Sequence, residues 1–226
     1  MKKILNSVVI LAALLAACTD YVQEIDNQYD EWNRSGLGNA ENNPAVVDPS
    51  TVVIGKVTDS RDNQTYKTVT IGAQTWMAEN LNYETENSFC YGSADSNCTK
   101  YGRLYTWAAA MTACPDGWHL PTKDEFKILF TAVGGQSTAG IMLRSTSGWY
   151  DDGNGTDTYV FSALPAGYRD FDGEFRGVNY YADFWSSTEN DSFRAYFMDL
   201  YYHDSGTHLG GDDDKLSGFS VRCLKD

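Results

Sequence analysis

The stretch that most constrains the fold is a proline-containing entry followed by a capped helix, residues 114–135. Thr122 and Glu125 have the spacing of a capping box, which marks the first turn of a helix. Apolar residues then recur at the spacing of one helix face, namely Phe126, Leu129, Phe130 and Val133. Two glycines, Gly134 and Gly135, are expected to end the helix. The sequence therefore predicts an amphipathic helix that begins directly after Thr122.

The entry to this helix is expected to have a structural role. Pro115 and Pro121 restrict the backbone ahead of the cap, so Trp118 and Leu120 are expected to point into a core. His119 lies between them with no second metal ligand close by in the sequence. A packed or hydrogen-bonded histidine is therefore favoured over a catalytic one.

The first eighteen residues are similar to a lipoprotein signal peptide. Two lysines precede an apolar run, residues 8–17, that is too short to span a bilayer as a stable helix. The ending Leu-Ala-Ala-Cys resembles the bacterial lipobox, so Cys18 is expected to become the lipidated N-terminus and to attach the protein to a membrane. An ordinary signal peptide is the alternative. Thr19 does not resemble the Asp-type signal for inner-membrane retention, which favours an outer-membrane lipoprotein of the cell envelope.

The composition restricts both the organisation and the partners of the chain. Residues 19–50 are rich in Asn and Asp without a sustained period, and they are expected to form a flexible tether to a folded domain at residues 51–226. The formal net charge is -14, from 31 acidic and 17 basic residues, so we expect no nucleic-acid partner. The 15 Tyr, 10 Phe and 6 Trp are typical of a β-rich exported domain, and equally of an aromatic sugar site.

The sequence of residues 51–226 predicts short strands around two short helices. Strands are expected at residues 52–57, 68–71, 75–77, 159–166, 183–187, 193–202 and 217–224. Helices are expected at residues 105–113 and after Thr122, with a polar loop at residues 89–99. Acidic turns are expected at residues 151–155, 170–173 and 210–214. This pattern predicts an α+β fold with several mostly antiparallel strands.

Four cysteines remain besides Cys18, and in an exported chain an even number favours disulfide bridges. Three connectivities are possible, and closeness in sequence favours Cys90 with Cys98, which leaves Cys114 with Cys223. A four-thiolate metal site fits poorly, because none of these cysteines has a close CxxC partner.

Five ordered motifs resemble the Fibrobacter succinogenes major paralogous domain. They are residues 72–81, 101–107, 114–122, 184–189 and 220–223. The resemblance covers the chain from Val53 to its end, and it includes Trp185 as a structural residue. It implies an exported protein, often a lipoprotein, in a family that no biochemical activity defines. It also implies a C-type-lectin-like fold, which formylglycine-generating enzymes share.

The resemblance does not bring the active sites of lectin-like proteins with it. The Glu-Pro-Asn, Gln-Pro-Asp and Trp-Asn-Asp triplets of calcium-dependent lectins are absent, and Trp185 is followed by two serines. Formylglycine-generating enzymes use a reactive cysteine pair, whereas the four cysteines here are expected to be structural. Fold alone therefore does not define the function.

Two groups of side chains are candidate sites. Asp151, Asp152, Asn154 and Asp157 offer oxygen ligands that could hold Ca²⁺, although solvated loop charge is favoured because the EF-hand pattern is not met. No other cofactor is expected. The second group is aromatic and could pack against sugar rings, with core packing as the alternative: Tyr168, Tyr180, Tyr181, Tyr201 and Tyr202.

These features favour a lipid-anchored envelope protein that is not an enzyme. Its lectin-like domain is expected to bind a polysaccharide or an envelope protein through its long loops. The alternatives are an enzyme of the formylglycine-generating or hydroxylase kind on the same fold, and a purely structural surface protein.

Overall fold

The structure is a computed structural model and describes residues 46–226. Within these residues it contains the strands β1 (Val53–Thr58), β2 (Thr65–Ile71), β3 (Gln74–Met77), β4 (Ser88–Phe89), β5 (Leu104–Tyr105), β6 (Trp118–His119), β7 (Tyr168–Arg169), β8 (Phe175–Arg176), β9 (Tyr181–Glu189), β10 (Arg194–Tyr201), β11 (His208–Asp214) and β12 (Leu224–Lys225). The helices are α2 (Asp95–Tyr101), α3 (Trp107–Ala110), α4 (Lys123–Ala132) and α5 (Gln136–Leu143), with 3-10 turns η1 (Pro49–Thr51) and η2 (Tyr91–Ser93). The predicted α+β class is confirmed.

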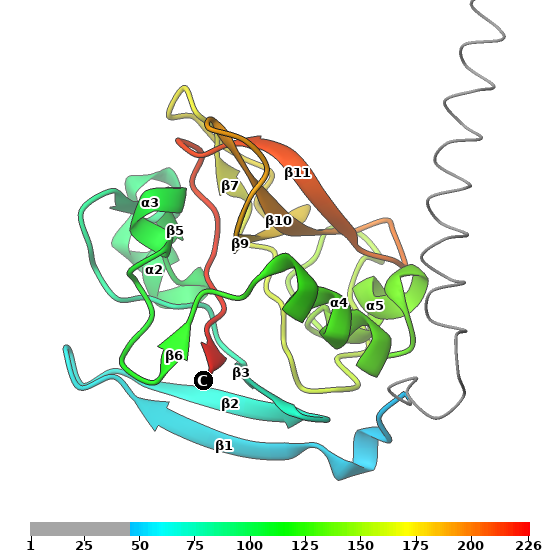
Figure 1. The fold of residues 1–226 in the computed structure, drawn as a ribbon. Coiled ribbons are helices and arrows are strands. Elements are labelled where there is room, and N and C mark those ends of the chain that lie inside the picture. The colour runs from blue at the N-terminus through cyan, green and yellow to red at the C-terminus, as the bar shows by residue number, and fades with distance from the viewer. Residues whose placement is uncertain (1–45) are drawn as a thin grey trace, which may run out of the picture. The chain divides into compact units, whose positions relative to one another are not determined.

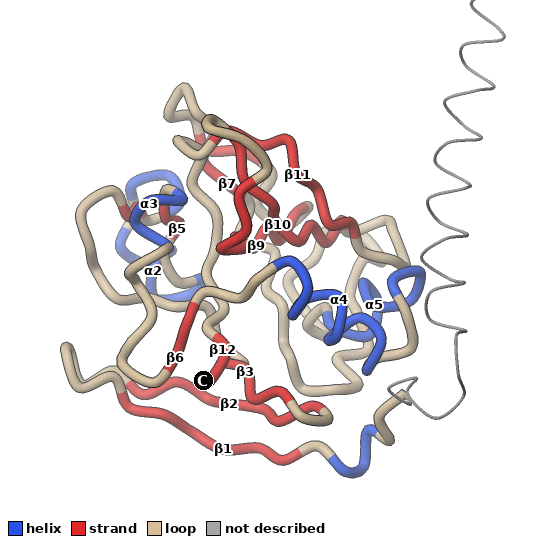
Figure 2. Tube along the Cα trace, in the orientation of Figure 1, coloured by secondary structure: helices blue, strands red, loops and turns tan. Residues whose placement is uncertain are grey.

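Two antiparallel sheets form opposite ends of the domain (Figure 1). The larger has five strands in the order β1-β2-β3-β12-β6, and the smaller has three in the order β11-β10-β9. Figure 2 shows α4 and α5 on one side of the domain and α2 and α3 on the other. The C-terminal strand β12 lies inside the larger sheet, where Leu224 pairs with Trp76 and with His119. Leu224 is therefore part of the core, whereas Lys225 and Asp226 are exposed.

The first described residue, residue 46, lies inside the stretch 19–50 that the sequence predicts to be a flexible tether. Val47 N donates to Ala132 O at 2.8 Å, and Val47 O accepts from the Tyr159 hydroxyl at 3.0 Å. Residues 46–50 thus pack on the domain. The expected signal peptide at residues 1–18, with Cys18, lies outside the described residues, as does the tether at residues 19–45. Among the described helices, none has the length and apolar character needed to cross a membrane.

The strands β1, β9 and β10 and the β2–β3 hairpin lie where the sequence predicts them, but the strand expected at residues 159–166 is absent. Val160 and Ser162 have positive φ angles of 58° and 54°, which an extended strand does not allow. Asp157 holds this turn, because its carboxylate accepts from Ser162 N at 2.7 Å and from Ser162 Oγ at 2.6 Å. Residues 217–224 also form little strand, because the segment crosses between the two sheets and makes isolated bridges on the way (Figure 1).

The turn expected at residues 210–214 is instead part of strand β11. Gly210 pairs with Phe197 of β10. A Cβ at Gly210 would lie 2.8 Å from the Phe197 ring, and one at Gly211 would lie 2.5 Å from the Tyr196 ring. The two glycines therefore allow the aromatic rings of β10 to lie against β11. Pairing with β10 overrides the local preference of this acidic, glycine-rich stretch for a turn.

The sequence predicts two helices, whereas the described residues form four. The structure has α3 and α4 at the expected places, and it adds α2 in the expected polar loop and α5 directly after Gly135. Helix α2 buries Cys98 and Tyr101. In α5, Gly140 lies against the backbone of Gly206, where a Cβ would come within 1.8 Å of the carbonyl oxygen. Tertiary contacts stabilise both helices, which explains why no amphipathic pattern reveals them.

The capped helix α4 forms as predicted. Glu125 Oε2 accepts from Thr122 N at 2.7 Å, and Glu125 N donates to Thr122 Oγ1 at 3.2 Å. The expected apolar face is buried, namely Phe126, Leu129, Phe130 and Val133. Ahead of the cap, Pro121 O accepts from Ser187 N of β9 at 2.8 Å. Leu120 is buried, whereas Trp118 is only half-buried because it lies in the edge strand β6.

His119 connects this helix to the C-terminus. Its Nδ1 lies 2.7 Å from Asp226 Oδ1, and its Nε2 lies 3.0 Å from Glu125 Oε1. Burial alone would lower the pKa of His119, but the hydrogen bonds to Asp226 and Glu125 outweigh burial and raise the pKa above its ordinary value. His119 therefore stabilises the fold as a hydrogen-bonded histidine.

Both expected disulfide bridges are present, Cys90–Cys98 and Cys114–Cys223. The first joins residues separated by 8 positions, and the second joins residues separated by 109. On a loop-entropy model they stabilise the fold by about 2–3 and about 4–5 kcal/mol. The longer bridge fixes the entry of α4 beside the C-terminal segment.

Arg222, the residue before the second half of that bridge, is completely buried. It donates hydrogen bonds to Asn80 Oδ1 at 2.6 Å, Met77 O at 3.2 Å, Ser162 O at 2.8 Å and Phe161 O. Its guanidinium carbon lies 4.7 Å from the centre of the Phe161 ring. Burial lowers the pKa of Arg222 to about 9, so the guanidinium is still charged at neutral pH.

We expect Arg222→Met to lower the free energy of unfolding by about 3–5 kcal/mol, because the buried acceptors around it lose their donor. Urea denaturation of the full-length protein, followed by tryptophan fluorescence, measures this change. Arg194→Met is the matched control, since Arg194 is exposed on β10; its effect should stay within about 0.5 kcal/mol. Equal stability of the two variants would contradict the role assigned to Arg222.

Candidate functional site

The strongest candidate site lies on one face of the sheet β11-β10-β9. Both β9 and β10 contain the pattern aromatic-x-Asp-x-aromatic, and antiparallel pairing sets the two patterns opposite each other. The paired residues are Tyr181 with Tyr201, Asp183 with Asp199 and Trp185 with Phe197. The alternate residues belong to the core on the other face, namely Ala182, Phe184, Met198 and Leu200. The sheet therefore separates a core face from a polar and aromatic face.

A pocket of about 210 Å³ opens on the polar and aromatic face. It is lined by Tyr168, Tyr181, Asp183, Phe197, Asp199, Asp213 and Phe219. Trp185 supports this pocket from beneath: it is fully buried, its ring lies 4.3 Å from that of Phe219, and its Nε1 donates to Tyr105 O at 2.8 Å. We refer to this space as the acidic pocket.

The three aspartates of the acidic pocket are held in an environment that disfavours their charge. Asp183 is only 4% exposed, and it lies directly across from Asp199 in the pairing of β9 with β10. Burial, and secondly the charge of Asp199, raise the pKa of Asp183 well above its ordinary value. Burial also raises the pKa of Asp199 and of Asp213. In the free protein the pair Asp183 and Asp199 therefore tends to retain a proton.

Tyrosines extend from the acidic pocket in a continuous series of ring contacts, which we call the tyrosine ladder. In order it contains Tyr168, Tyr181, Tyr201, Tyr202, Tyr180 and Tyr150. Successive ring centres are 6.0, 4.8, 4.7, 5.3 and 4.5 Å apart. The rings are half-buried except that of Tyr150, which is 48% exposed. The structure thus brings the five candidate tyrosines together with Tyr150 in one series of ring contacts.

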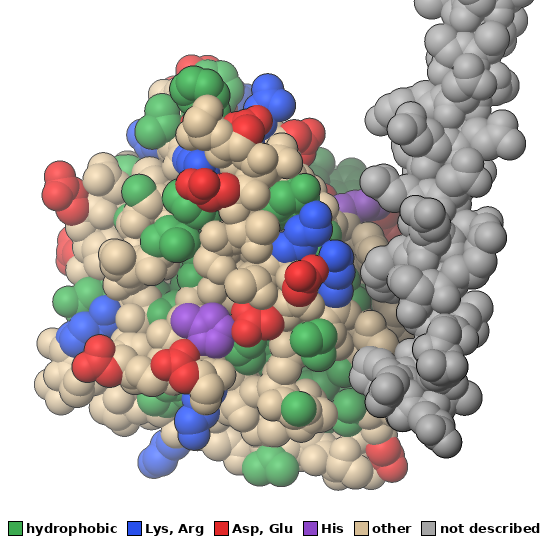
Figure 3. All heavy atoms as spheres, in the orientation of Figure 1, with side chains coloured by type: hydrophobic (Ala, Val, Ile, Leu, Met, Phe, Trp, Pro, Cys, Tyr) green, Lys and Arg blue, Asp and Glu red, His purple; other side chains and the backbone are tan. Residues whose placement is uncertain are grey.

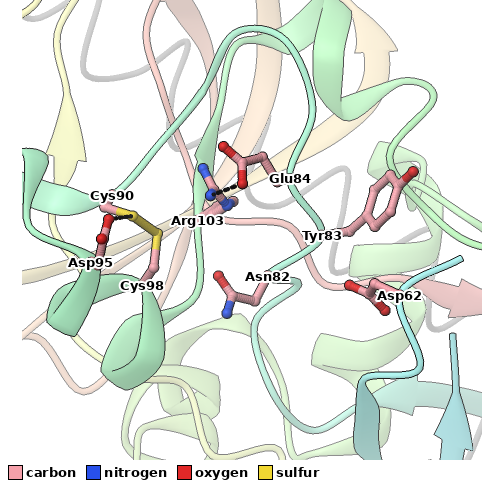
Figure 4. A pocket seen from close by; sticks show the side chains of 8 residues that line it. All are labelled: Asp62, Asn82, Tyr83, Glu84, Cys90, Asp95, Cys98 and Arg103. Atoms are coloured by element: carbon pink, nitrogen blue, oxygen red, sulfur yellow. Dashed lines mark hydrogen bonds and ion pairs between the residues drawn. A yellow bond between two sulfur atoms is a disulfide. The ribbon is translucent and has the colours of Figure 1, made fainter.

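A larger pocket of about 560 Å³ lies beside the Cys90–Cys98 bridge, between the β4–β5 region and the β1–β2 turn (Figure 4). Figure 4 shows Arg103 and Glu84 pointing toward each other, and their ion pair is 2.9 Å long. The guanidinium of Arg61 covers the ring of Tyr83 at 3.7 Å. Arg103 and Glu84 thus already bind each other, whereas Asn82 Oδ1 in the lining of this pocket is buried without a hydrogen-bond partner.

The acidic turn proposed for calcium uses its side chains on its own backbone. Asn154 Oδ1 accepts from Trp149 N at 3.2 Å, and Asp157 holds the turn at Ser162 as described above. Asp151 and Asp152 are exposed. Across residues 46–226, no three His, Cys, Asp or Glu side chains are gathered closely enough to hold a metal ion. Asn154 and Asp157 thus hydrogen-bond within this turn, and calcium binding by the four residues stays a prediction.

Sequence reasoning missed the acidic pocket, although a signal for it exists. Asp183 and Asp199 occupy the centre of the two aromatic-x-Asp-x-aromatic patterns, and a charged residue between aromatic residues of the same strand face is unusual in a core. Asp213 lies in the stretch that looked like a turn. The aromatic-x-Asp-x-aromatic pattern could have identified Asp183 and Asp199 from the sequence. Only the pairing of β10 with β11 shows that Asp213 lies beside them.

The described residues thus form an α+β domain with several antiparallel sheets, two disulfide bridges and an acidic, aromatic pocket. A family model described as Fibrobacter succinogenes major domain matches residues 69–225, and the chain belongs to this family. No curated protein and no solved structure was found to match the chain. The face of the domain in Figure 3 carries acidic and basic side chains among separate hydrophobic areas.

We expect Asp183→Asn to stabilise the free domain at neutral pH. The pKa of Asp183 is higher in the folded state than in the unfolded state, where it is about 3.9. The protonated Asp183 therefore contributes its full share of stability below that unfolded-state pKa, and this share is lost as the pH rises through the folded-state pKa. The asparagine variant lacks this loss, so its melting temperature should exceed that of the wild type at pH 7 and approach it near pH 4. Melting curves across this pH range measure the difference.

Asp116→Asn provides the control, because Asp116 is exposed and distant in sequence from the pocket strands. Its melting temperature should follow the wild type at every pH. A wild-type protein as stable as Asp183→Asn at pH 7 would contradict the burial of an unpaired carboxyl at this position.

Proposed function

We propose that the protein is a lipid-anchored protein of the cell envelope, held in the outer membrane, whose lectin-like domain binds polysaccharide without acting as an enzyme. The observation that carries this proposal is the continuity between the tyrosine ladder and the acidic pocket. Tyr168 and Tyr181 belong to both. A ligand that packs on the rings would therefore also meet the carboxyls.

The chemistry of the two parts suits a chain of sugar rings. The C–H faces of sugars pack on aromatic rings, and tyrosine adds a hydroxyl that can donate or accept a hydrogen bond. Carboxylates accept hydrogen bonds from sugar hydroxyls. A mainly aromatic surface with a few convergent polar groups is the usual composition of a small-molecule site. The length of the ladder favours an extended ligand over a single sugar.

Two observations support binding rather than catalysis. Burial raises the pKa of both Asp183 and Asp199, which face each other across β9 and β10, whereas a glycoside hydrolase needs one of its two carboxyls ionised as nucleophile or base. In the described part of the chain, all four cysteines are in disulfide bridges, which does not suit the reactive thiols of formylglycine-generating enzymes. The membrane attachment rests on the lipobox-like ending at Cys18.

We expect Tyr180→Ala combined with Tyr202→Ala to weaken polysaccharide binding by roughly tenfold, because two stacking rings are lost at about 0.5–1.5 kcal/mol each. Binding of the full-length protein to an array of envelope and cell-wall glycans measures this effect. Phe193→Ala is the control, since Phe193 is 73% exposed and lies outside the ladder. Unchanged binding by the double variant, or no glycan bound by the wild type, would refute the proposal.

We also expect the native protein to begin at Cys18 carrying acyl chains. Mass spectrometry of the N-terminal peptide from membranes of the producing cell tests this directly. Cys18→Ala should release the protein from the membrane fraction, because the lipid attachment is lost. An unmodified Cys18 in the wild type would rule out the anchor without affecting the proposal for the domain.

A further inference from the structure

The acidic pocket lacks a positive charge among its lining residues. Three of the lining residues are aspartates, and the others are tyrosine or phenylalanine. Asp183 is nine-tenths buried and faces the pocket, and no backbone amide or basic side chain of the described residues donates to its carboxyl. Asp199 Oδ1 is a buried atom without a hydrogen-bond partner. The site therefore contains acceptors that only a ligand would satisfy.

Asp59, another buried aspartate of the domain, shows the ordinary solution to this problem. It is fully buried, and Arg61 Nη2 lies 2.7 Å from its Oδ2. No equivalent arginine or lysine faces Asp183. Burying carboxyls without a cation is costly for the free domain, which suggests that a cation arrives with the ligand.

The walls of the acidic pocket suit an organic cation. The ring of Tyr168 stands at 78° to that of Tyr181 and at 88° to that of Phe219. The ring of Phe197 stands at 50° to that of Phe219. Aromatic rings set at steep angles around a small space form a cage that attracts an ammonium group. A metal ion suits this site less, since the described residues gather no group of three His, Cys, Asp or Glu side chains that could hold one.

The volume of the pocket limits the size of the cationic group. The acidic pocket measures about 210 Å³, against about 560 Å³ for the larger pocket, so it suits one small group rather than an extended chain. The rest of an oligosaccharide would continue along the tyrosine ladder, which begins at Tyr168 and Tyr181.

We propose that the acidic pocket binds the ammonium group of an amino sugar within a polysaccharide, with Asp183 and Asp199 as acceptors and the surrounding aromatic rings as walls. This inference rests on the proposed polysaccharide-binding function and adds the chemical class of the sugar. Asp213 contributes a third carboxyl group at the pocket. The ladder positions the neighbouring sugar rings, and the pocket selects a free amine over an acetylated one.

The test compares a glucosamine tetramer with its fully N-acetylated counterpart, titrated calorimetrically into the full-length protein at about 0.15 M salt, where long-range charge effects are screened. We expect the free amine form to bind at least tenfold more tightly. Asp183→Asn should abolish this preference. That variant is expected to fold, because it removes a buried carboxyl with no positive partner. Asp116→Asn, which removes one exposed charge elsewhere, should keep the full preference.

Three results would overturn the inference. Equal affinity for the two tetramers, with both weakened by the tyrosine double variant, would refute amine recognition and leave polysaccharide binding intact. A preference that survives Asp183→Asn would place amine recognition outside the acidic pocket. Displacement of the glucosamine tetramer by Nα-acetyl-lysine amide at equal concentration would show that the site recognises any primary amine rather than a sugar. If neither tetramer nor any other glycan binds, the proposed function itself fails.

Discussion

The fold depends on the buried guanidinium of Arg222. It satisfies acceptors from the end of β3 and from the irregular turn at Phe161 and Ser162, so it fixes two distant parts of the chain against the C-terminal segment. The adjacent Cys223 is bonded to Cys114 at the entry of α4. A charge and a covalent bond at neighbouring positions thus hold the last strand inside the larger sheet. Loss of the charge alone would leave several buried carbonyl groups without a donor.

The same arrangement positions the site. Arg222 lies 5.4 Å from the ring of Phe184, which belongs to the core face of β9. Once that face is fixed, the alternation of a strand directs Tyr181 and Asp183 to the opposite face, beside their partners on β10. Core and site are therefore two faces of one strand pair. A shift of register by one residue would exchange them, so packing of the core specifies the site.

The acidic pocket costs stability, and this cost is the physical argument for a function. Asp183 is buried without a positive partner, whereas Asp59, another buried aspartate, is neutralised by Arg61 at 2.7 Å. A protein that carried these carboxyls for structure alone would be more stable with neutral side chains. The tyrosine ladder points to the same conclusion, because it adds an aromatic path that leads from the pocket to exposed Tyr150.

The sequence alone determined the capped helix α4, the β2–β3 hairpin and the family, because each depends on local spacing or on ordered motifs. It favoured the two disulfide pairs among three connectivities, and it singled out ladder tyrosines as candidate ligand contacts. Tertiary structure decided the rest: β11 and α5 form against neighbours that are distant in sequence, and the entry tryptophan Trp118 lies at a sheet edge. Above all, the acidic pocket exists only because pairing of β9, β10 and β11 brings Asp183, Asp199 and Asp213 together. A local pattern shows which face a residue takes on its own strand, but not which residue stands across from it.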